Sequence, residues 1–592
     1  MIKSFVRNTL AAFLGAALFF FFLLIVLTSM TAEEKIEVPD RAILVIDLSL
    51  PISDKPNARG ASGAIEDTLL SLPVQTTTLL QVTDAIRNAA GDDRVVGIYL
   101  HGDITGLELS SGWATLKEVR EELLRFRETG KKIFAYNMHY SEREYYLASA
   151  ADRIAMHPAG ILEFNGLETE ILFYAGAFRK YGIGVQVTRA GEFKSAVEPY
   201  TLEKLSPAGR EQVEDFLGDI FDEFLTAVSS SRKIPVETLR GIARTGLIDG
   251  RDVTETGLVD EAVSFDVILD EMMTFTGTGG EDRTFRQISL LDYSKSMEDA
   301  SRSGDNRIAL IYVEGDLVDG DSLIEAGGDT VARLLRAART DDSVRAVVLR
   351  VNSPGGSAAA AEVILREVAL TREKKPVVVS LGSTAASGGY WIACRADEIV
   401  AEPNTITGSI GVYGIFPNIG KLMNDLGLTV DTVRTAPQAD IMSLYRPRTD
   451  DELALLRKLV ERTYEEFLDN VAGGRDLKKE TVRVIARGRV WSGRDALELG
   501  LVDTLGGLSD AVKSAARRAG LSEGYSLSCH QEERSFLEGV LDLFSRTRDN
   551  EVAQAGLVGR EMGNILTVLR KLDNFNDPRG AYARMPWNLT IR

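Results

Sequence analysis

Three segments from the first half of this 592-residue chain recur in the same order about 245 residues later. The matched pairs are residues 92–100 (DDRVVGIYL) with 341–349 (DDSVRAVVL), 145–154 (YYLASAADRI) with 390–399 (YWIACRADEI), and 250–260 (GRDVTETGLVD) with 493–503 (GRDALELGLVD). Matches at a nearly constant spacing indicate that one structural unit has been duplicated. We therefore expect two copies of one domain, over residues 41–275 and 307–522, because the chain is too long for a single core.

Short apolar runs alternate with longer amphipathic stretches within each copy. In the second copy, residues 346–351, 377–381 and 399–401 are typical of buried strands, and residues 359–372 and 452–471 are typical of helices. Such alternation predicts a largely parallel sheet covered by helices, which is an α/β fold.

Two further regions lie outside the predicted copies. Residues 276–306 are rich in Gly, Ser and Asp, and we expect a linker or surface crossover there. Residues 523–592 form a C-terminal tail whose apolar residues have helical spacing at Phe536, Val540, Leu541 and Phe544. This tail is expected to pack against the body or to contact another subunit.

Residues 1–32 predict a cytoplasmic stub and a transmembrane helix. Residues 10–27 are almost wholly apolar, which is just long enough to span a bilayer core. Lys3 and Arg7 precede this run and Glu33 and Glu34 follow it, which favours a cytoplasmic N-terminus and an external body. The alternative is a cleaved secretory signal. The run is longer than an ordinary signal core, however, and no clean Ala-x-Ala site follows it.

The overall composition argues against several classes of function. A formal net charge of -19 argues against a nucleic-acid partner, because phosphate binding needs clustered cations. The chain has only two cysteines, Cys394 and Cys529, and four histidines, none of them in a metal-binding pair. We therefore expect no cysteine-rich or paired-histidine metal site, and the serine–lysine chemistry described below needs neither a metal nor an organic cofactor.

A serine at the end of a predicted strand is the first candidate for chemistry. Ser387 follows the strand at residues 377–381 and precedes Gly388 and Gly389, where a helix is expected to begin. A serine at this position faces unpaired backbone N–H groups and the positive end of the helix dipole. The amide of Gly388 is then a natural donor to an oxyanion. A lone Ser-Gly-Gly is usually only a turn, so this motif needs a partner.

Lys194 is the candidate partner. It follows the probable strand at residues 185–190, and its neighbours Phe193, Ala196 and Val197 are apolar. Burial disfavours the ammonium form of lysine, so a buried amine can act as a base near neutral pH. Serine–lysine pairs are a known variant of the hydrolytic triad. The alternative interpretation of Lys194 is a solvated surface lysine. The alternative base is His139, but it lies near the first-copy counterpart of the Ser387 segment and not near Ser387 in the sequence.

The serine and lysine segments, residues 382–391 and 191–199, closely resemble the signal peptide peptidase A family in its long, tandem-repeat form. The resemblance extends over nearly the whole chain and implies a fold like that of crotonase and the Clp protease. It implies that Ser387 is the nucleophile, that Lys194 is the general base, and that Ser409 orients the lysine amine. It also implies that the Gly-Gly turn after residue 354 supplies the second oxyanion donor, with Gly356 favoured and Gly355 close behind.

The duplication adds a prediction about where the site lies. At the repeat spacing, the counterpart of Ser387 is Glu142, and the counterpart of Lys194 falls near Gln438 or Ala439. Each copy has therefore kept one partner only. We expect a single site per chain, at the interface of the two copies, and no activity at either remnant.

These observations predict a membrane-bound serine endopeptidase with its body in a bacterial periplasm, anchored in the inner membrane. The resemblance implies that it degrades signal peptides released from exported proteins, and other extended apolar peptides. It also implies a bowl-like homo-oligomer, expected to be a tetramer. Two alternatives remain: an acyl-CoA enzyme of the crotonase type, and a non-catalytic membrane scaffold.

Overall fold

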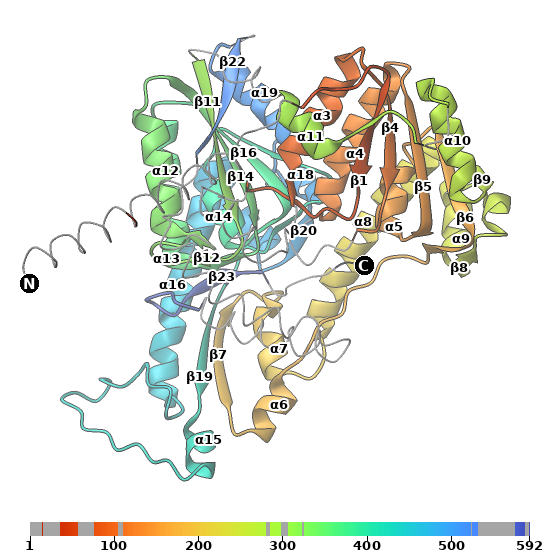
Figure 1. Cartoon of the computed structure of the whole chain (residues 1–592). Helices are drawn as coiled ribbons and strands as arrows, with labels where there is room; N and C mark the ends of the chain where they lie inside the picture. The colour runs from red at the N-terminus through yellow and green to blue at the C-terminus, as the bar shows by residue number, and fades with distance from the viewer. Residues whose placement is uncertain are drawn as a thin grey trace, which may run out of the picture.

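The computed structural model describes residues 36–56, 76–104, 111–279, 284–297, 306–322, 325–521, 524–530 and 575–585, together with Gly15 and Ile591. Two α/β bodies lie side by side in it, and a smaller layer of strands and helices lies below them (Figure 1). The two copies predicted from the repeated segments are confirmed as tandem α/β units. We call them repeat 1 and repeat 2.

Repeat 1 is built on a sheet in which the described strands run in the order β10-β1-β4-β5-β6-β8, with β9 paired to β6. All of these pairs are parallel except β6 with β8. Its strands are β1 (Ala42–Asp47), β4 (Val95–His101), β5 (Lys132–Tyr140), β6 (Arg153–Phe164), β8 (Gly246–Asp249), β9 (Glu261–Ala262) and β10 (Gln287–Ser289). Its helices are α3 (Leu79–Gly91), α4 (Trp113–Glu128), α5 (Glu142–Ala148), α8 (Pro207–Arg232), α9 (Val236–Ala243), α10 (Phe265–Thr276) and α11 (Leu290–Met297).

Repeat 2 has the corresponding sheet, in the order β20-β18-β16-β14-β11-β22, with β17 paired to β16 and β21 paired to β17. Its strands are β11 (Asn306–Glu314), β14 (Val344–Ser353), β16 (Val377–Ala386), β17 (Glu398–Ala401), β18 (Ile406–Gly408), β20 (Val490–Ser492), β21 (Thr504–Leu505) and β22 (Tyr525–His530). Its helices are α12 (Gly328–Thr340), α13 (Ala358–Arg372), α14 (Gly388–Ala393), α15 (Gly420–Asp425), α16 (Asp450–Arg475), α17 (Lys479–Ile485), α18 (Gly493–Glu498) and α19 (Leu508–Arg518).

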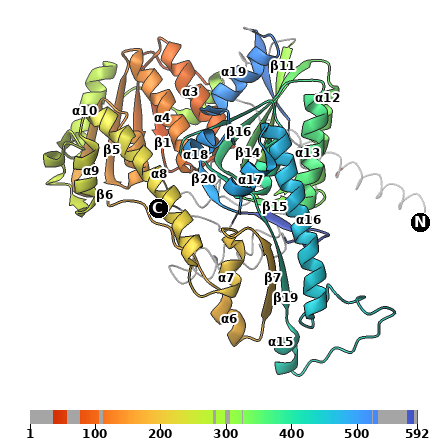
Figure 2. The same ribbon diagram turned by 180° about the vertical axis from the view of Figure 1, so that it is seen from behind.

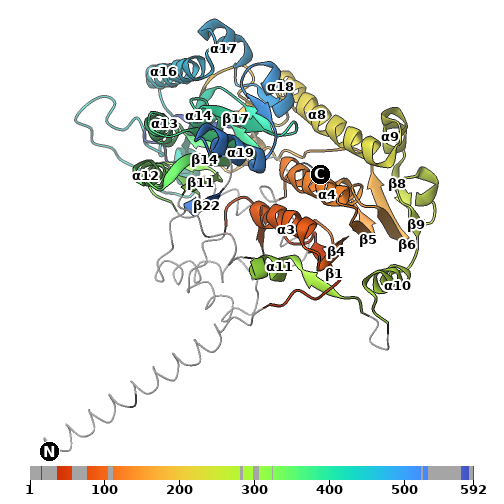
Figure 3. The same ribbon diagram turned by 90° about the horizontal axis from the view of Figure 1, so that it is seen from above.

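The apolar residues of β14 explain why repeat 2 is layered. Val347, Leu349 and Val351 belong to a core shared with α12 and α13, whereas Ala346 and Val348 pack with α19 on the opposite face. Successive strand residues point to opposite faces, so a strand with apolar residues on both faces needs cover on both sides. Figure 2 shows α13 and α16 on one side of this sheet, and Figure 3 shows the two repeats next to each other from above.

The two repeats make the same internal bonds at corresponding positions. The Tyr145 hydroxyl donates to the carbonyl of Leu258 at 2.6 Å, and the Tyr390 hydroxyl donates to the carbonyl of Leu501 at 2.8 Å. Arg232 pairs with Asp260 in repeat 1, as Arg475 pairs with Asp503 in repeat 2. These matched bonds confirm that the duplication seen in the sequence is also present in the structure.

A buried ion network joins the repeats. Arg350 on β14 is fully buried, and its guanidinium donates to Asp54 at 2.8 Å and to Glu118 at 2.7 Å, both from repeat 1. Removing one partner of such a group leaves a buried charge unpaired, which typically lowers the free energy of unfolding by about 3–5 kcal/mol. The relative position of the repeats is therefore fixed by charge pairing as well as by apolar packing.

A third sheet combines segments from across the chain, in the order β13-β12-β15-β23-β19-β7. Its strands are β12 (Leu317–Val318), β13 (Ala326–Gly327), β15 (Gly355–Ser357), β23 (Tyr582–Arg584), β19 (Val412–Asn418) and β7 (Gly184–Ala190). Next to β7 lie α6 (Ala175–Lys180), the 3-10 turn η1 (Ser195–Val197) and α7 (Glu198–Thr201). A two-stranded ribbon elsewhere pairs β2 (Ile52–Ser53) with β3 (Thr77–Thr78).

Two expectations about the regions outside the repeats need comment. The stretch predicted as a linker contains β10, which extends the sheet of repeat 1, and α11, which buries Leu290 and Tyr293. The prediction of a linker was wrong for β10 and α11, because a few apolar residues are enough to pack this mostly polar segment against repeat 1. The apolar tail residues 536–544 and the predicted anchor, except Gly15, lie outside the described residues. Among the described residues, no helix combines the length and the apolarity needed to cross a bilayer.

Candidate active site

Lys194 reaches repeat 2 on an arm of repeat 1. The arm is strand β7, which pairs antiparallel with β19 of repeat 2 along its whole length, from Gly184 with Asn418 to Ala190 with Val412. The chain then turns at Gly191, whose φ of +111° suits only glycine, and the 3-10 turn η1 begins after Lys194. The lysine predicted as the base is thus held against the repeat that carries the predicted nucleophile.

Ser387 lies between β16 and α14, as the sequence predicted. Its amide donates to the carbonyl of Gly408 at 2.8 Å, and its own carbonyl accepts the first helical bond of α14 from Trp391. The backbone at Ser387 is unusual, with φ +56° and ψ −113°, and its side chain caps no helix amide. A residue other than glycine held at such angles costs about 1–3 kcal/mol and marks a place where the fold imposes a side-chain direction.

The two side chains meet. The Lys194 Nζ lies 2.7 Å from the Ser387 Oγ. It also lies 2.9 Å from the carbonyl oxygen of Ser409 and 3.0 Å from the Ser409 Oγ. A neutral amine has two N–H groups and one lone pair. If Ser409 accepts both N–H groups, the lone pair is left for the hydroxyl hydrogen of Ser387.

The surroundings disfavour the charged form of this amine. Lys194, Ser387 and Ser409 are each 0% exposed. Burial lowers the pKa of the Lys194 amine well below its ordinary value, because the ammonium form loses its hydration. Among the described residues, no carboxylate forms an ion pair with the amine, so nothing offsets that loss. The arrangement therefore has a proton donor, a proton acceptor and no competing charge.

Two supports of the lysine were not found by sequence reasoning. Gln212 on α8 is fully buried, donates to the carbonyl of Phe193 at 2.9 Å and accepts from the amide of Val490 at 3.2 Å. The turn at residues 487–489 accepts the Phe193 amide at the Arg487 carbonyl and the Ser409 amide at the Arg489 carbonyl. A glutamine inside an amphipathic helix and an Arg-Gly-Arg turn carry no local signal for this role.

The predicted oxyanion donors lie together next to Ser387. Gly388 follows it directly, and Gly355 packs so closely that a Cβ on Gly355 would lie 2.6 Å from the Gly388 nitrogen. The Gly355 amide already donates to the Ser353 Oγ at 3.2 Å. The choice of Gly356 over Gly355 as the second donor stays a prediction.

The predicted remnants lie apart from this cluster. Glu142 begins α5 of repeat 1 and accepts from the amides of Asn165 and Gly166 at 2.6 and 3.0 Å. Gln438 and Ala439 lie in an exposed loop between α15 and α16. His139 on β5 faces Glu163 at 3.6 Å within repeat 1. None of these four residues contacts Lys194 or Ser387.

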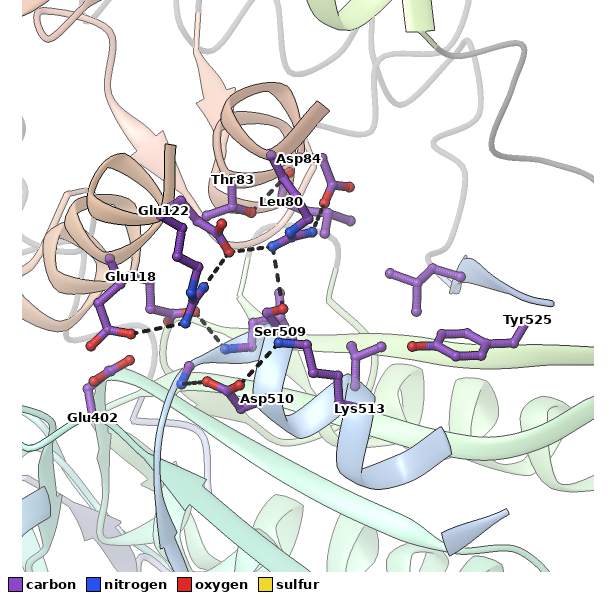
Figure 4. Close-up of a pocket in the computed structure, with 17 residues that line it drawn as sticks. Leu80, Thr83, Asp84, Glu118, Glu122, Glu402, Ser509, Asp510, Lys513 and Tyr525 are labelled. Atoms are coloured by element: carbon purple, nitrogen blue, oxygen red, sulfur yellow. Dashed lines mark hydrogen bonds and ion pairs between the residues drawn. The ribbon is translucent and has the colours of Figure 1, made fainter. Parts of the chain in front are cut away.

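A separate cavity of about 280 Å³ lies between α3 and α4 of repeat 1 and α19 of repeat 2 (Figure 4). Arg87, Glu118, Glu122, Glu402 and Asp510 are among the residues that line it. Lys194, Ser387 and Ser409 do not line it. It is a feature of the inter-repeat contact and not of the Ser387–Lys194 cluster.

Comparison with known proteins adds an independent line of evidence. The model of the family described as "Peptidase family S49" matches twice, at residues 125–278 and 369–522. "Protease 4" of Salmonella typhi is 36% identical over 92% of this chain and 90% of its own length. "Protease 4" of Haemophilus influenzae is 34% identical over 85% and 84%, respectively. "Serine protease SPPA, chloroplastic" of Arabidopsis thaliana is 30% identical over 81% and 69%.

Proposed function

The chain belongs to peptidase family S49 and is a serine protease, and on this premise we propose that Ser387 is its nucleophile and Lys194 its general base. The observation that carries the proposal is the 2.7 Å contact between the Lys194 Nζ and the Ser387 Oγ. Serine is a weak nucleophile until a neighbouring base takes its proton. A buried neutral amine at hydrogen-bonding distance can do this.

In the acylation step, the Lys194 amine takes the Ser387 hydroxyl proton while the oxygen attacks the peptide carbonyl carbon. The ammonium that forms can donate to all three oxygens now around it, two from Ser409 and one from Ser387. The ammonium then protonates the leaving amine as the C–N bond breaks. Ser409 is therefore proposed to orient the base in both of its protonation states.

The amides of Gly388 and Gly356 are proposed to hold the tetrahedral oxyanion, with Gly355 shaping the space between them. Removing one such donor typically costs about 2.7–4 kcal/mol of transition-state stabilisation. In the second half of the reaction, water gives a proton to the Lys194 amine and attacks the acyl group. The protonated lysine returns that proton to the Ser387 oxygen as the ester bond breaks. The cycle requires no cofactor.

Released signal peptides and other extended apolar peptides are the substrates we propose. The match to the proteases named above over most of their length supports this, as does the position of Ser387 at the end of strand β16. We also propose that each repeat has the fold of crotonase and the Clp protease. The evidence for this is the pairing of a Gly-Gly turn and a serine at the ends of neighbouring strands β14 and β16.

We propose a bacterial inner-membrane location, with the body in the periplasm. The apolar run at residues 10–27, with positive charges before it and negative charges after it, supports a single-pass anchor. A vesicle flotation assay on the full chain and on a chain that begins at residue 36 would test this. Retention of the shorter chain on vesicles would contradict the anchor.

A homo-oligomer, with a tetramer expected, is the assembly we propose. Within the chain, strand β7 of repeat 1 joins strand β19 of repeat 2. The counterpart of β7, residues 428–434, forms no strand and is exposed, with Val433 97% exposed. The counterpart of β19, near residues 167–173, exposes Leu172. Repeat 2 of one subunit could thus join repeat 1 of the next, and such head-to-tail contacts close into rings. Val433→Asp should reduce the mass measured by light scattering.

Active-site labelling tests the central proposal. A fluorophosphonate should add once per chain, and mass spectrometry of the digest should place the adduct on Ser387. The Ser387→Ala and Lys194→Met variants should stay unlabelled, whereas Ser195→Ala should still be labelled at Ser387. Ser195 is the matched control, because its hydroxyl is equally buried next to Lys194 but bonds to Phe193 and Gln212. An adduct on another residue, or none on a folded protein, would contradict the assignment.

A further inference from the structure

A segment from the far C-terminus fills the space between the two halves of the site. Strand β23 lies between β15, which contains the Gly-Gly turn, and β19, which holds the lysine arm. Its pairing is antiparallel to both neighbours, with Gly356 opposite Ala583 and Tyr413 opposite Tyr582. Without β23 these two strands would face each other across a slot one strand wide. An extended peptide can enter such a slot by adding a strand.

The register places one carbonyl of this segment at the proposed oxyanion donors. A Cβ on Gly355 would lie 2.2 Å from the Ala583 carbonyl oxygen and 2.6 Å from the Gly388 nitrogen. A Cβ on Gly388 would lie 2.8 Å from the same carbonyl oxygen. Because neither glycine has a Cβ, the Ala583 carbonyl can occupy the space between them. A substrate carbonyl bound between these two glycines would compete for the same space.

The side chains of the segment alternate as in a bound peptide. Ala581 and Ala583 are fully buried against the core of repeat 2. Tyr582 points the other way, into a cluster with Ala196, Val197 and Tyr413 that includes the lysine arm. The slot thus accepts small residues at alternate positions on one side and an aromatic ring on the other.

Polar contacts hold the segment at both ends. The Asp577 carboxylate accepts from the Ser357 hydroxyl at 2.7 Å and from the Ala359 amide at 2.8 Å. At the other end, Arg584 donates to the Asp316 carboxylate from two of its guanidinium nitrogens, at 3.0–3.1 Å. The Met585 amide donates to the Pro354 carbonyl at 2.6 Å. These contacts tie the segment to the Gly-Gly turn itself.

We propose that residues 575–585 are a tethered, substrate-like inhibitor that occupies the peptide slot in the register of a substrate, with the Ala583 carbonyl at the site of attack. This inference rests on the proposed function of Ser387 and Lys194. External peptides bind only after the segment leaves. A tethered ligand competes at an effective concentration of about 1 mM, so even a weak one suppresses the binding of dilute peptides.

The occupant also defines the peptide class that the slot takes. Its Ala581-Tyr582-Ala583 sequence has the small-x-small pattern that stands at the cleavage site of secretory signals. The slot is therefore built for peptides with small residues at the positions of Ala581 and Ala583.

The first experiment loosens the inhibitor in the full chain. Arg584→Ala removes the ion pair to Asp316 and should increase the rate of fluorophosphonate labelling of Ser387 about ten-fold, with a similar fall in KM for a small-x-small peptide. Arg232→Ala is the control: its side chain is 13% exposed, against 12% for Arg584, and its ion pair with Asp260 lies in repeat 1. Unchanged labelling and KM in a folded Arg584→Ala variant would overturn the proposal.

A second experiment needs only the unmodified protein. A peptide aldehyde ending in Ala-Tyr-Ala should bind Ser387 covalently and expel the segment, so hydrogen exchange at the amides of residues 582–584 should become fast. Continued protection of those amides in the aldehyde complex would show that the segment is a permanent part of the sheet. Failure of the aldehyde to bind either the wild type or Arg584→Ala, while fluorophosphonate labels both equally, would also overturn the inference. Failure of fluorophosphonate to label Ser387 at all would instead reject the proposed function.

Discussion

The same strand–turn–helix unit serves different ends in the two repeats. In repeat 1, Ser141 caps α5 with an ordinary φ of −86°, forms a capping box with Glu144, and is followed by Glu142, which binds two loop amides. In repeat 2, Ser387 stands at the start of α14 with φ +56° and caps nothing. A missing N-cap typically costs about 1 kcal/mol. Repeat 2 thus forgoes a local stabilising bond and directs its hydroxyl at Lys194.

For the strand that leads to the lysine, it is repeat 1 that has kept the functional part. In repeat 1, β7 is fully paired and delivers Lys194 to the other repeat. The corresponding stretch of repeat 2 is exposed and ends near Ala439, which has no titratable group. Neither repeat contains a complete site. Duplication has let each unit retain the part that its partner lacks, and the predictions below probe that division.

The largest effect is expected at the arm. Lys194→Met keeps a side chain of similar length but removes the base, and we expect kcat/KM for peptide hydrolysis to fall about 10⁴-fold. The free energy of unfolding in urea should stay the same or rise, because a buried polar amine is replaced by an apolar group. Substantial peptidase activity in this variant would mean that the base comes from elsewhere.

The pH dependence follows from the burial of the same amine. Burial lowers the pKa of Lys194, so the catalytically useful neutral form is present above that lowered pKa. As the pH falls through it, kcat/KM should drop about ten-fold per pH unit. Stopped assays across a pH series would measure this. A kcat/KM that stays constant at every pH at which the protein remains folded would contradict a neutral lysine base.

The orienting serine should matter less than the base. Ser409→Ala removes one of the two acceptors for the amine hydrogens but leaves the carbonyl of residue 409 in place. We expect kcat to fall about 10²-fold with little change in KM, because the lone pair is less well aimed. Ser195→Ala is the control for disturbance of the buried cluster. An equal loss in both variants would indicate packing and not orientation.

Some parts of this architecture could be predicted from the sequence. The repeated segments indicated two α/β units, and Ser387 was recognisable because a strand, a serine and two glycines follow each other directly. The apolar neighbours of Lys194 indicated burial. These signals are local, and they depend on residue type and spacing within a few residues.

The remaining parts depend on contacts between distant segments. Nothing local to β7 indicates that it pairs with β19, more than two hundred residues away, and the Lys194–Ser387 contact depends on that pairing. Gln212 looks like an ordinary helix residue until its two partners are in place. Strand β23 has three residues and no periodicity, so the sequence predicted only packing or subunit contacts for the tail. Long-range pairing of short segments carries little signal in a single sequence.

The smallest effect on activity is expected at the remnant in repeat 1. Glu142→Ser places a serine at the counterpart of Ser387, yet no lysine stands near it, so fluorophosphonate should still add once per chain, at Ser387. Peptidase activity should stay within about two-fold of wild type, while the free energy of unfolding should fall by about 1–3 kcal/mol because two loop amides lose their acceptor. Glu142→Gln retains an acceptor and should lose less stability. A second adduct, at residue 142, would show that repeat 1 holds a latent site of its own, and the division of labour between the repeats would then be incomplete.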